Sequence, residues 1–212
     1  MLYNELIPAE QKGSHRLMVM LHGLGDSIEG YHWLPEAMGF PWLNYLLVNA
    51  PDDYFGGFSW FNFEGDMAPG VQRSRKLLFE LLDATRAKGF PASQTVMGGF
   101  SQGGLMSVEV GLRYPYLLAG VVSISGYVCE PEKLIKELSP VALRQRLLVT
   151  HGKLDPMIPF ARSREQIAFL QKASLNIAWH EFVKAHTIAG EDELEVIRNF
   201  VRAGYGEAGA SS

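Results

Sequence analysis

Short apolar runs of strand length recur along the chain, separated by longer segments of mixed polarity. Residues 176–182 alternate between apolar and polar side chains, whereas five other runs are mostly apolar throughout: 16–21, 43–50, 94–98, 119–125 and 146–150. An unbroken apolar run suits a strand buried on both faces, as in a parallel sheet covered by helices. Residues 1–14 add a short alternating stretch that predicts an edge strand.

The segments between these runs carry apolar residues at helical spacing, and they cover 31–38, 71–88, 105–114, 160–172 and 191–201. In 71–88 four leucines share one face, charged residues occupy the other, and Gly89 ends the pattern. Strands that alternate with helices predict an α/β fold with a mostly parallel central sheet and helices on both faces. Ligands of such sheets bind at the carboxyl ends of the strands.

One α/β domain is predicted over residues 1–203. The length of 212 residues is ordinary for a single domain of this class, and no change in composition divides the chain. Hydrophobic residues make up 47% and charged residues 20%, which permits a sizeable core and excludes an extensively disordered chain. Residues 204–212 are small and polar, and they predict a flexible C-terminal tail.

The distribution of charge argues against a nucleic-acid partner. Lys plus Arg number 19 and Asp plus Glu number 23, giving a formal charge of −4. No basic stripe is present that could neutralise a phosphate backbone. We therefore expect no nucleic-acid partner.

Cysteine content and the N-terminal residues predict the compartment. Cys129 is the only cysteine, so the chain forms no internal disulfide and no thiolate metal cluster, which fits a reducing environment. Residues 1–5 lack the basic start and apolar core of a signal peptide, and no apolar run reaches transmembrane length. We expect a cytoplasmic protein, and the sequence leaves open whether it is a monomer or a homodimer.

A candidate nucleophile lies in the sequence Gly99-Phe100-Ser101-Gln102-Gly103, which fits G-x-S-x-G. A strand is predicted before it and a helix after it, as in a nucleophile elbow. The glycines are required because a side chain at either position would collide with neighbouring backbone in so tight a turn. Strain in this turn would hold the Ser101 hydroxyl clear of the sheet, within reach of a substrate.

A serine hydroxyl needs a base, and His186 is the candidate because it follows the last predicted strand. The other five histidines are less suitable. His15 precedes the first buried strand, and His32 and His180 fall inside a predicted helix and strand. His22 and His151 each stand at the end of a strand, where an imidazole bonded to loop backbone is the simpler interpretation.

An acid must orient that base, and Asp155 follows the strand predicted at 146–150. Its position matches the order Ser, then Asp or Glu, then His of the α/β-hydrolase arrangement. Asp-Pro is also turn chemistry in its own right, so a purely structural role is the alternative. Glu191 and Asp192 lie near His186 in sequence and remain rivals to Asp155.

Two backbone N–H groups are candidates for an oxyanion hole: that of Gln102, after the nucleophile, and that of Leu24, in the glycine-rich segment after the first buried strand. This segment, 22–26, lacks the G-x-G-x-x-G pattern of a dinucleotide site and the Gly-Lys-Ser/Thr end of a phosphate loop. The segment therefore does not indicate a nucleotide cofactor.

Residues 52–70 are rich in glycine and aromatic side chains, which is unusual for a long loop unless the loop covers something. A satellite hydrophobic cluster is one interpretation. We favour the other, a wall of an apolar substrate pocket, because the glycines would prevent a regular strand or helix from hiding these rings in the sheet. Phe58, Trp60 and Phe61 are expected to contact the substrate, together with Ile158 from the Asp155 loop.

Three motifs together resemble the phospholipase/carboxylesterase family, which includes the acyl-protein thioesterases: His22-Gly23-Leu24-Gly25-Asp26, Gly99-Phe100-Ser101-Gln102-Gly103-Gly104 and His151-Gly152-(two residues)-Asp155-Pro156-(two residues)-Pro159. Trp60-Phe61 also resembles a tryptophan–phenylalanine element of that family, and the resemblance runs from about Leu17 to Phe200. It implies an α/β-hydrolase fold without metal or cofactor, and ester or thioester hydrolysis through an acyl-serine.

The resemblance assigns Ser101, Asp155 and His186 to a catalytic triad, and Leu24 and Gln102 to an oxyanion hole. One departure concerns the histidine loop, because the family usually has glycine before the catalytic histidine whereas Ala185 precedes His186 here. The segment 52–70 matches the family only in part, so the resemblance implies no acyl-chain preference.

The sequence therefore predicts a cytoplasmic serine esterase or thioesterase for small to medium acyl groups, with a lipidated protein or a lysophospholipid among the conceivable acyl donors. The same triad could instead perform acyl transfer or peptide hydrolysis. A catalytically idle hydrolase fold that binds a hydrophobic ligand is a third hypothesis, but such a protein has no need to retain the serine, aspartate and histidine.

Overall fold

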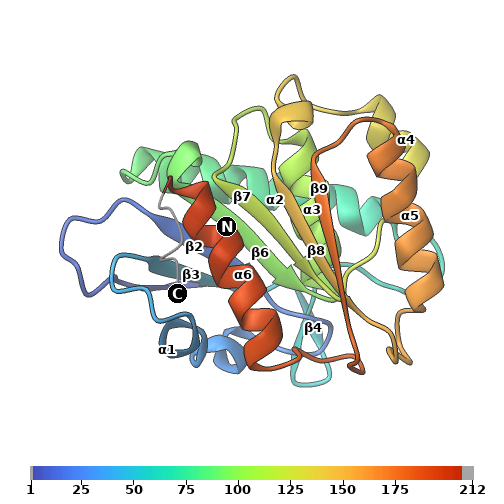
Figure 1. Ribbon diagram of the computed structural model, residues 1–212, viewed down its shortest axis with the longest axis horizontal. Coiled ribbons are helices and arrows are strands. Elements are labelled where there is room, and N and C mark those ends of the chain that lie inside the picture. Colours follow the sequence, from blue (N-terminus) through green and yellow to red (C-terminus); the bar gives the residue numbers. More distant parts are fainter. Residues whose placement is uncertain (1, 207–212) are drawn as a thin grey trace.

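The computed structural model describes residues 2–206, which form a seven-stranded sheet covered by helices on both faces (Figure 1). The strand order is β1-β3-β2-β6-β7-β8-β9. Six strands are parallel and β1 pairs antiparallel with β3 at the edge. The strands are β1 (Asn4–Ile7), β2 (Leu17–Leu21), β3 (Asn44–Val48), β6 (Thr95–Phe100), β7 (Gly120–Ile124), β8 (Leu147–Gly152) and β9 (Ile177–Phe182).

The sheet confirms the strands expected from the apolar runs. Every residue of β2, β3, β7 and β8 is buried, because helices cover both faces of these inner strands. The edge strand β9 instead alternates between less and more exposed positions, as its sequence does. Since β6, β8 and β9 are all parallel, their carboxyl ends lie at the same edge of the sheet.

The helices form two layers. Buried residues of α2 (Ala68–Ala87), α3 (Gln102–Arg113), α4 (Pro131–Lys136) and α5 (Phe160–Lys172) belong to the core on one face. Those of α1 (Leu34–Met38) and α6 (Glu191–Gly204) belong to the core on the other, where Figure 1 shows α6 in front of the sheet. Short 3-10 turns cover Ile28–Tyr31, Ala92–Gln94 and Ala142–Arg144. Among residues 2–206, none of the helices combines the length and apolar character needed to cross a bilayer.

The aromatic segment corrects our expectation of an irregular loop. Strands β4 (Asp52–Tyr54) and β5 (Gly57–Ser59) form a small antiparallel hairpin. Its two-residue turn has positive φ at both positions, 44° at Phe55 and 88° at Gly56. Such a turn matches the twist of paired strands, so the glycine at 56 permits a regular hairpin rather than preventing one.

Trp60 and Phe61, which follow this hairpin, are fully buried in the core that also contains residues of α2 and α3. Gly70 in α2 makes room for this contact, because a Cβ there would lie 2.7 Å from the Cβ of Phe61. Of the other rings, Phe58 is partly buried against the same core, Phe63 is 46% exposed and Phe55 is 94% exposed. Trp60 and Phe61 therefore belong to the main core, which corresponds neither to the pocket wall that we favoured nor to a separate satellite cluster.

Gly204 and Tyr205, which we expected in the C-terminal tail, belong to the folded domain. Gly204 is the last residue of α6, where a Cβ would lie 2.6 Å from the carbonyl oxygen of Ala119. Tyr205 is buried, and its hydroxyl donates a hydrogen bond to the Leu17 carbonyl at 2.9 Å. Its ring also packs edge-on against Trp42. Residues 207–212 of the expected tail lie outside the described residues.

Tyr205→Ala is expected to lower the free energy of unfolding by about 3 kcal/mol, because it removes a buried ring and leaves a cavity. Urea denaturation of the full chain measures the change. The matched control is Asn199→Ala on the exposed face of α6, which should change stability by less than about 0.5 kcal/mol. Equal stability of the two variants would show that Tyr205 lies outside the cooperative core.

Candidate active site

Ser101 lies in the turn between β6 and α3, in a backbone conformation that is rare for residues with a side chain. Its φ is 55° and its ψ is −115°. The strain is held by neighbouring structure, because the Ser101 N–H donates to the Ile124 carbonyl of β7 at 2.9 Å. The predicted strand–turn–helix is thus confirmed, and it presents the serine at the carboxyl end of β6.

Two glycines make this turn possible. A Cβ at Gly99 would lie 2.2 Å from the carbonyl oxygen of Gly103, and a Cβ at Gly103 would lie 2.2 Å from that of Leu21. Both distances are far below any real Cβ contact, and the obstacle in each case is backbone. The G-x-S-x-G spacing therefore has a steric cause in the close approach of β2, β6 and α3.

His186 and Asp155 reach Ser101 from loops that follow β9 and β8. The distance from Ser101 Oγ to His186 Nε2 is 2.9 Å, and that from His186 Nδ1 to Asp155 Oδ2 is 2.7 Å. Because an ionised Asp155 only accepts, His186 carries its proton on Nδ1 and leaves Nε2 to accept from the serine hydroxyl. The structure thus brings together three side chains that are widely separated in the sequence.

The Asp155 carboxylate is buried and fully hydrogen-bonded. Its Oδ1 accepts the N–H groups of Met157 and Ile158, both at 2.9 Å, while Oδ2 faces His186. Burial opposes ionisation, but the Ile158 N–H and then His186 outweigh it, so the pKa of Asp155 lies below its ordinary value. The carboxylate therefore remains charged at neutral pH and holds the imidazole in one tautomer and orientation.

The rival carboxylates point elsewhere. Glu191 forms an ion pair with Arg198 on α6, and Asp192 is exposed in the first turn of the same helix. In the described part of the chain, Asp155 is the one carboxylate bonded to His186. The geometry therefore favours Asp155 over both alternatives.

His22 and His151 are buried beneath the site and bonded to loop backbone. The Nδ1 of His22 lies 2.6 Å from the Gly23 carbonyl, and its Nε2 accepts the Ala50 N–H at 3.0 Å. The Nε2 of His151 lies 3.0 Å from the Ile158 carbonyl. Burial lowers the pKa of both imidazoles, so they are neutral and serve to fix the loops around them.

Leu24 and Gln102, the two residues expected to supply oxyanion-hole N–H groups, both line the hollow in front of Ser101. Gln102 begins α3, where backbone N–H groups lack an intrahelical acceptor and carry the positive end of the helix dipole. Within residues 2–206, neither N–H donates to a protein acceptor. Two donors are therefore available to an oxygen that gains negative charge next to the serine.

The side chain of Gln102 fastens the start of α3 to the segment after β5, a role that no sequence pattern indicated. Its Oε1 accepts the Trp60 N–H at 3.0 Å, and its Nε2 donates to the Phe61 carbonyl at 2.9 Å. The Trp60 indole N–H in turn donates to the His22 carbonyl at 2.9 Å. Trp60 thus connects the elements that carry the two candidate oxyanion donors.

The β4–β5 hairpin supports the loop that follows β2 through backbone hydrogen bonds. The Gly25 N–H donates to the Phe58 carbonyl, and the Phe58 N–H donates to the Asp26 carbonyl, both at 2.9 Å. Gly57 allows this approach, because a Cβ there would lie 2.1 Å from the Gly25 carbonyl oxygen. Phe58 therefore supports the loop that carries Leu24.

A hollow of about 320 Å³ opens in front of Ser101. Apart from the serine, the histidine and residues of the oxyanion loop, its wall is largely apolar and includes Phe63, Phe100, Tyr127, Met157 and Ile158. Of the four residues predicted to contact a substrate, Ile158 lines this hollow, whereas Trp60, Phe61 and Phe58 do not. Phe63 and Tyr127 escaped prediction because composition does not show which ring of an aromatic segment faces a cavity.

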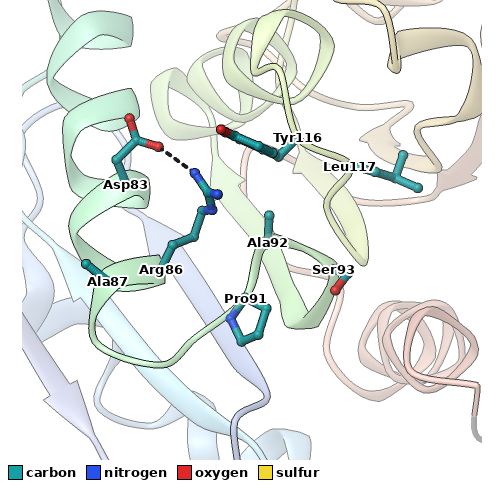
Figure 2. Close-up of a pocket in the computed structure, with 8 residues that line it drawn as sticks. All are labelled: Asp83, Arg86, Ala87, Pro91, Ala92, Ser93, Tyr116 and Leu117. Atoms are coloured by element: carbon teal, nitrogen blue, oxygen red, sulfur yellow. Dashed lines mark hydrogen bonds and ion pairs between the residues drawn. The ribbon is translucent and has the colours of Figure 1, made fainter.

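A larger hollow, of about 690 Å³, lies at the amino end of β6, opposite the carboxyl end that carries Ser101 (Figure 2). Pro91, Ala92 and Ser93 line it just before the strand begins, so β6 separates this hollow from Ser101. Its one cation, Arg86, is already paired with Asp83 and lies over the Tyr116 ring. The cation of this hollow is therefore already paired, and the hollow lies away from the chemistry at Ser101.

A buried ion pair anchors the histidine loop. Lys184 Nζ lies 2.7 and 2.8 Å from the two carboxylate oxygens of Glu193, and both side chains are almost inaccessible. Glu193 also accepts the Ala189 N–H at 2.6 Å. Because Lys184 and Ala189 lie on either side of His186, Glu193 fastens both ends of the loop to α6.

Neither a metal cluster nor a thiolate competes with Ser101. Within residues 2–206, no group of three or more His, Cys, Asp or Glu side chains is arranged to hold a metal ion. Burial, followed by the charge of Glu109, raises the pKa of the Cys129 thiol to about 11. The thiol is therefore protonated at neutral pH and is a weak nucleophile.

Glu193→Ala is expected to lower the free energy of unfolding by about 3–5 kcal/mol, because it leaves the Lys184 ammonium buried without its partner. Chemical denaturation measures this loss. The double variant Lys184→Met/Glu193→Leu should recover most of the stability, yet it cannot hold the Ala189 N–H and should still react more slowly at Ser101. Full reactivity of the double variant would show that the pair does not position the loop.

Comparison with known proteins places this geometry in a family. The Phospholipase/Carboxylesterase family matches residues 3–204. Acyl-protein thioesterase 1 of Schizosaccharomyces pombe is 31% identical over 166 residues, covering 72% of this chain and 74% of that protein.

Solved structures agree on the fold. The crystal structure of esterase PE8 superposes with a TM-score of 0.83 at 29% identity, covering 95% of this chain and 98% of that one. The Bacillus cereus carboxylesterase, at 20% identity, supports the fold alone, with a TM-score of 0.81 and coverage of 96% and 95%. The α/β-hydrolase fold is thereby confirmed, and this chain belongs to the phospholipase/carboxylesterase family.

Proposed function

We propose that this chain hydrolyses carboxylic esters and thioesters of small to medium acyl groups through an acyl-serine intermediate at Ser101. The observation that carries the proposal is the unbroken series of contacts from Ser101 through His186 to the ionised Asp155, at 2.9 and 2.7 Å. Membership of an ester-hydrolase family supports the same reaction.

Acylation would begin when Ser101 Oγ attacks the carbonyl carbon and its proton passes to His186 Nε2. The carbonyl oxygen becomes negative and accepts from the N–H groups of Leu24 and Gln102. Loss of one such donor typically costs about 10²–10³ in turnover, so this contact is a large part of the catalytic effect. As the intermediate collapses, the bond to the leaving oxygen or sulfur breaks and that atom takes the proton from Nε2.

Deacylation would repeat these steps with water. His186 Nε2 takes a proton from a water molecule, whose oxygen attacks the acyl carbon. The second intermediate collapses when the bond to Ser101 Oγ breaks and the proton returns to the serine. The products are the carboxylic acid and the free enzyme, and no cofactor enters the balance.

The acyl group would lie in the 320 Å³ hollow, against Phe63, Tyr127 and Ile158. The name of the thioesterase relative supports lipidated proteins among the acyl donors, and the family name supports oxygen esters such as lysophospholipids. Acyl transfer or peptide hydrolysis would use the same contacts, and the choice depends on which nucleophile or leaving group the site accepts.

A fluorophosphonate probe is expected to label one site, Ser101, because only an activated serine reacts with it. Labelling should disappear in Ser101→Ala and fall to background in His186→Ala, as measured by mass spectrometry of the intact protein and its peptides. An adduct that persists without Ser101 would refute the assignment of the nucleophile. Absence of an adduct in the wild-type chain would support an idle fold.

Asp155→Asn is expected to lower kcat by about 10⁴-fold while the fold is retained, because the amide favours the wrong imidazole tautomer. The matched control is Asp192→Asn, which changes an exposed carboxylate on the neighbouring helix and should leave kcat nearly unchanged. Steady-state hydrolysis of a p-nitrophenyl ester measures both. The reverse pattern would make Asp192 the orienting acid.

Each methylene added to a p-nitrophenyl ester should raise kcat/KM by about fourfold, corresponding to ~0.8 kcal/mol of buried CH₂, until the hollow is full. Phe63→Ala should flatten this rise, because Phe63 forms part of the wall. Trp60→Ala should instead destabilise the fold by about 3–5 kcal/mol, since the ring is core. An unchanged chain-length profile in Phe63→Ala would place the acyl group elsewhere.

A further inference from the structure

A hollow of about 410 Å³, here called the second hollow, lies beside the 320 Å³ hollow in front of Ser101, here called the first hollow. Phe100, Asp26 and His186 line both hollows, whereas Ser101, Leu24 and Gln102 line only the first. The rings of Phe100 and His186 pack with centroids 4.9 Å apart, so they form a partition between the two spaces. Beyond this partition the lining includes Tyr31, Trp33, Ile188 and Leu194.

The proposed reaction requires two different directions of approach at the acyl carbon. The carbonyl oxygen must point to the N–H groups of Leu24 and Gln102, which lie on the side of the first hollow. The leaving atom must receive its proton from His186 Nε2, so it must lie next to the imidazole. A substrate that satisfies both conditions directs its acyl chain into the first hollow and its alcohol or thiol past His186.

We propose that the second hollow binds the alcohol or thiol part of the substrate, and that it selects apolar leaving groups that are neutral or cationic. This inference rests on the proposed ester and thioester hydrolysis at Ser101. It assigns to Trp33 and Ile188 a role in leaving-group specificity that is separate from the acyl pocket, and to Asp26, which lines both hollows, a role in charge preference.

Trp33 supplies a fixed apolar wall. Its side chain is 40% exposed, yet its indole N–H donates to the Gly30 carbonyl at 2.7 Å, which limits rotation of the ring. A large aromatic surface held in place at the mouth of a hollow offers contact area at little cost in conformational entropy. Ile188 comes from the histidine loop, so the wall includes the same loop as the base.

Asp26 sets the charge preference. It is the one carboxylate of the lining, and the lining contains neither lysine nor arginine. Its Oδ1 accepts the Ser27 N–H at 2.8 Å, which holds the carboxylate in place. Gly30 leaves room for it, because a Cβ there would lie 2.5 Å from Oδ1. A negatively charged leaving group would be repelled here, whereas a neutral or cationic one would not.

The first experiment compares butyrate esters of ethanol and of 2-naphthylmethanol, which share one acyl-enzyme. Trp33→Ala is expected to lower kcat/KM for the naphthylmethyl ester by about tenfold, through lost apolar contact, and to leave the ethyl ester nearly unchanged. Because both substrates form the same butyryl-serine, single-turnover measurement should show an unchanged deacylation rate. The matched control, Phe63→Ala, should alter acyl-chain dependence with little effect on the ratio between the two alcohols.

The second experiment uses butyryl thioesters of N-acetylcysteine, of its methyl ester and of thiocholine, whose leaving thiols carry an anionic, a neutral and a cationic group. The wild-type kcat/KM should be lowest for the anion. The variant Asp26→Asn keeps an acceptor for the Ser27 N–H. It should raise kcat/KM for the anionic substrate, relative to kcat/KM for the cationic one, by about tenfold. An unchanged ratio would overturn the charge preference.

These outcomes separate the two proposals. If the wild-type chain neither hydrolyses the esters nor reacts with a fluorophosphonate, the proposed function fails. If it does both, but Trp33→Ala slows deacylation or changes the acyl-chain profile, the second hollow binds the acyl group and the leaving-group assignment is overturned. Full fluorophosphonate labelling of Trp33→Ala would show that any loss of ester turnover arises from binding rather than from misfolding.

Discussion

The position of the reactive serine depends on how closely β2, β6 and α3 approach one another. Gly99 and Gly103 are in contact with backbone at distances where a side chain has no room. A methyl group at Gly103 would push α3 away from β2, and one at Gly99 would push α3 away from β6. Either change would shift Gln102 relative to Leu24. The strained conformation of Ser101 persists because packing and hydrogen bonds on all sides over-determine it. Nucleophile and oxyanion donors are therefore positioned by one steric constraint.

Buried polar contacts keep the loops around that constraint in place. Trp60 and the side chain of Gln102 connect the start of α3 with the end of β2, and Glu193 holds both ends of the histidine loop. In a low-dielectric interior each such bond is strong when made and costly when broken. The loops that bear the reacting groups therefore behave as parts of the core, although loops are usually the mobile part of a fold. Such rigidity favours a pre-organised site.

On the proposed assignment, the imidazole of His186 serves as a wall of two spaces as well as a base. Its Nε2 takes a proton from Ser101 and then delivers it to the leaving atom, so the leaving group must lie next to the imidazole, which lines both hollows. The Phe100 ring extends this partition. Specificity for the acyl group and for the leaving group then resides in different side chains, such as Phe63 and Trp33, and each can vary without the other.

The sequence alone indicated the seven strands of the central sheet and most of the helices between them, because unbroken apolar runs distinguish strands buried on both faces from their surroundings. It also indicated Ser101, Asp155 and His186, since each follows a predicted strand and parallel strands end at one edge of the sheet. Only the tertiary structure decided the rest. Trp60 and Phe63 belong to the same glycine-rich segment, yet one is core and the other lines the cavity. That difference depends on the β4–β5 hairpin and on contacts of the segment with Gly25 and α2. These contacts join residues that are distant in the sequence, so no local pattern shows them. Apolar character predicts that a side chain will be buried, whereas the surface that buries it is chosen by long-range packing.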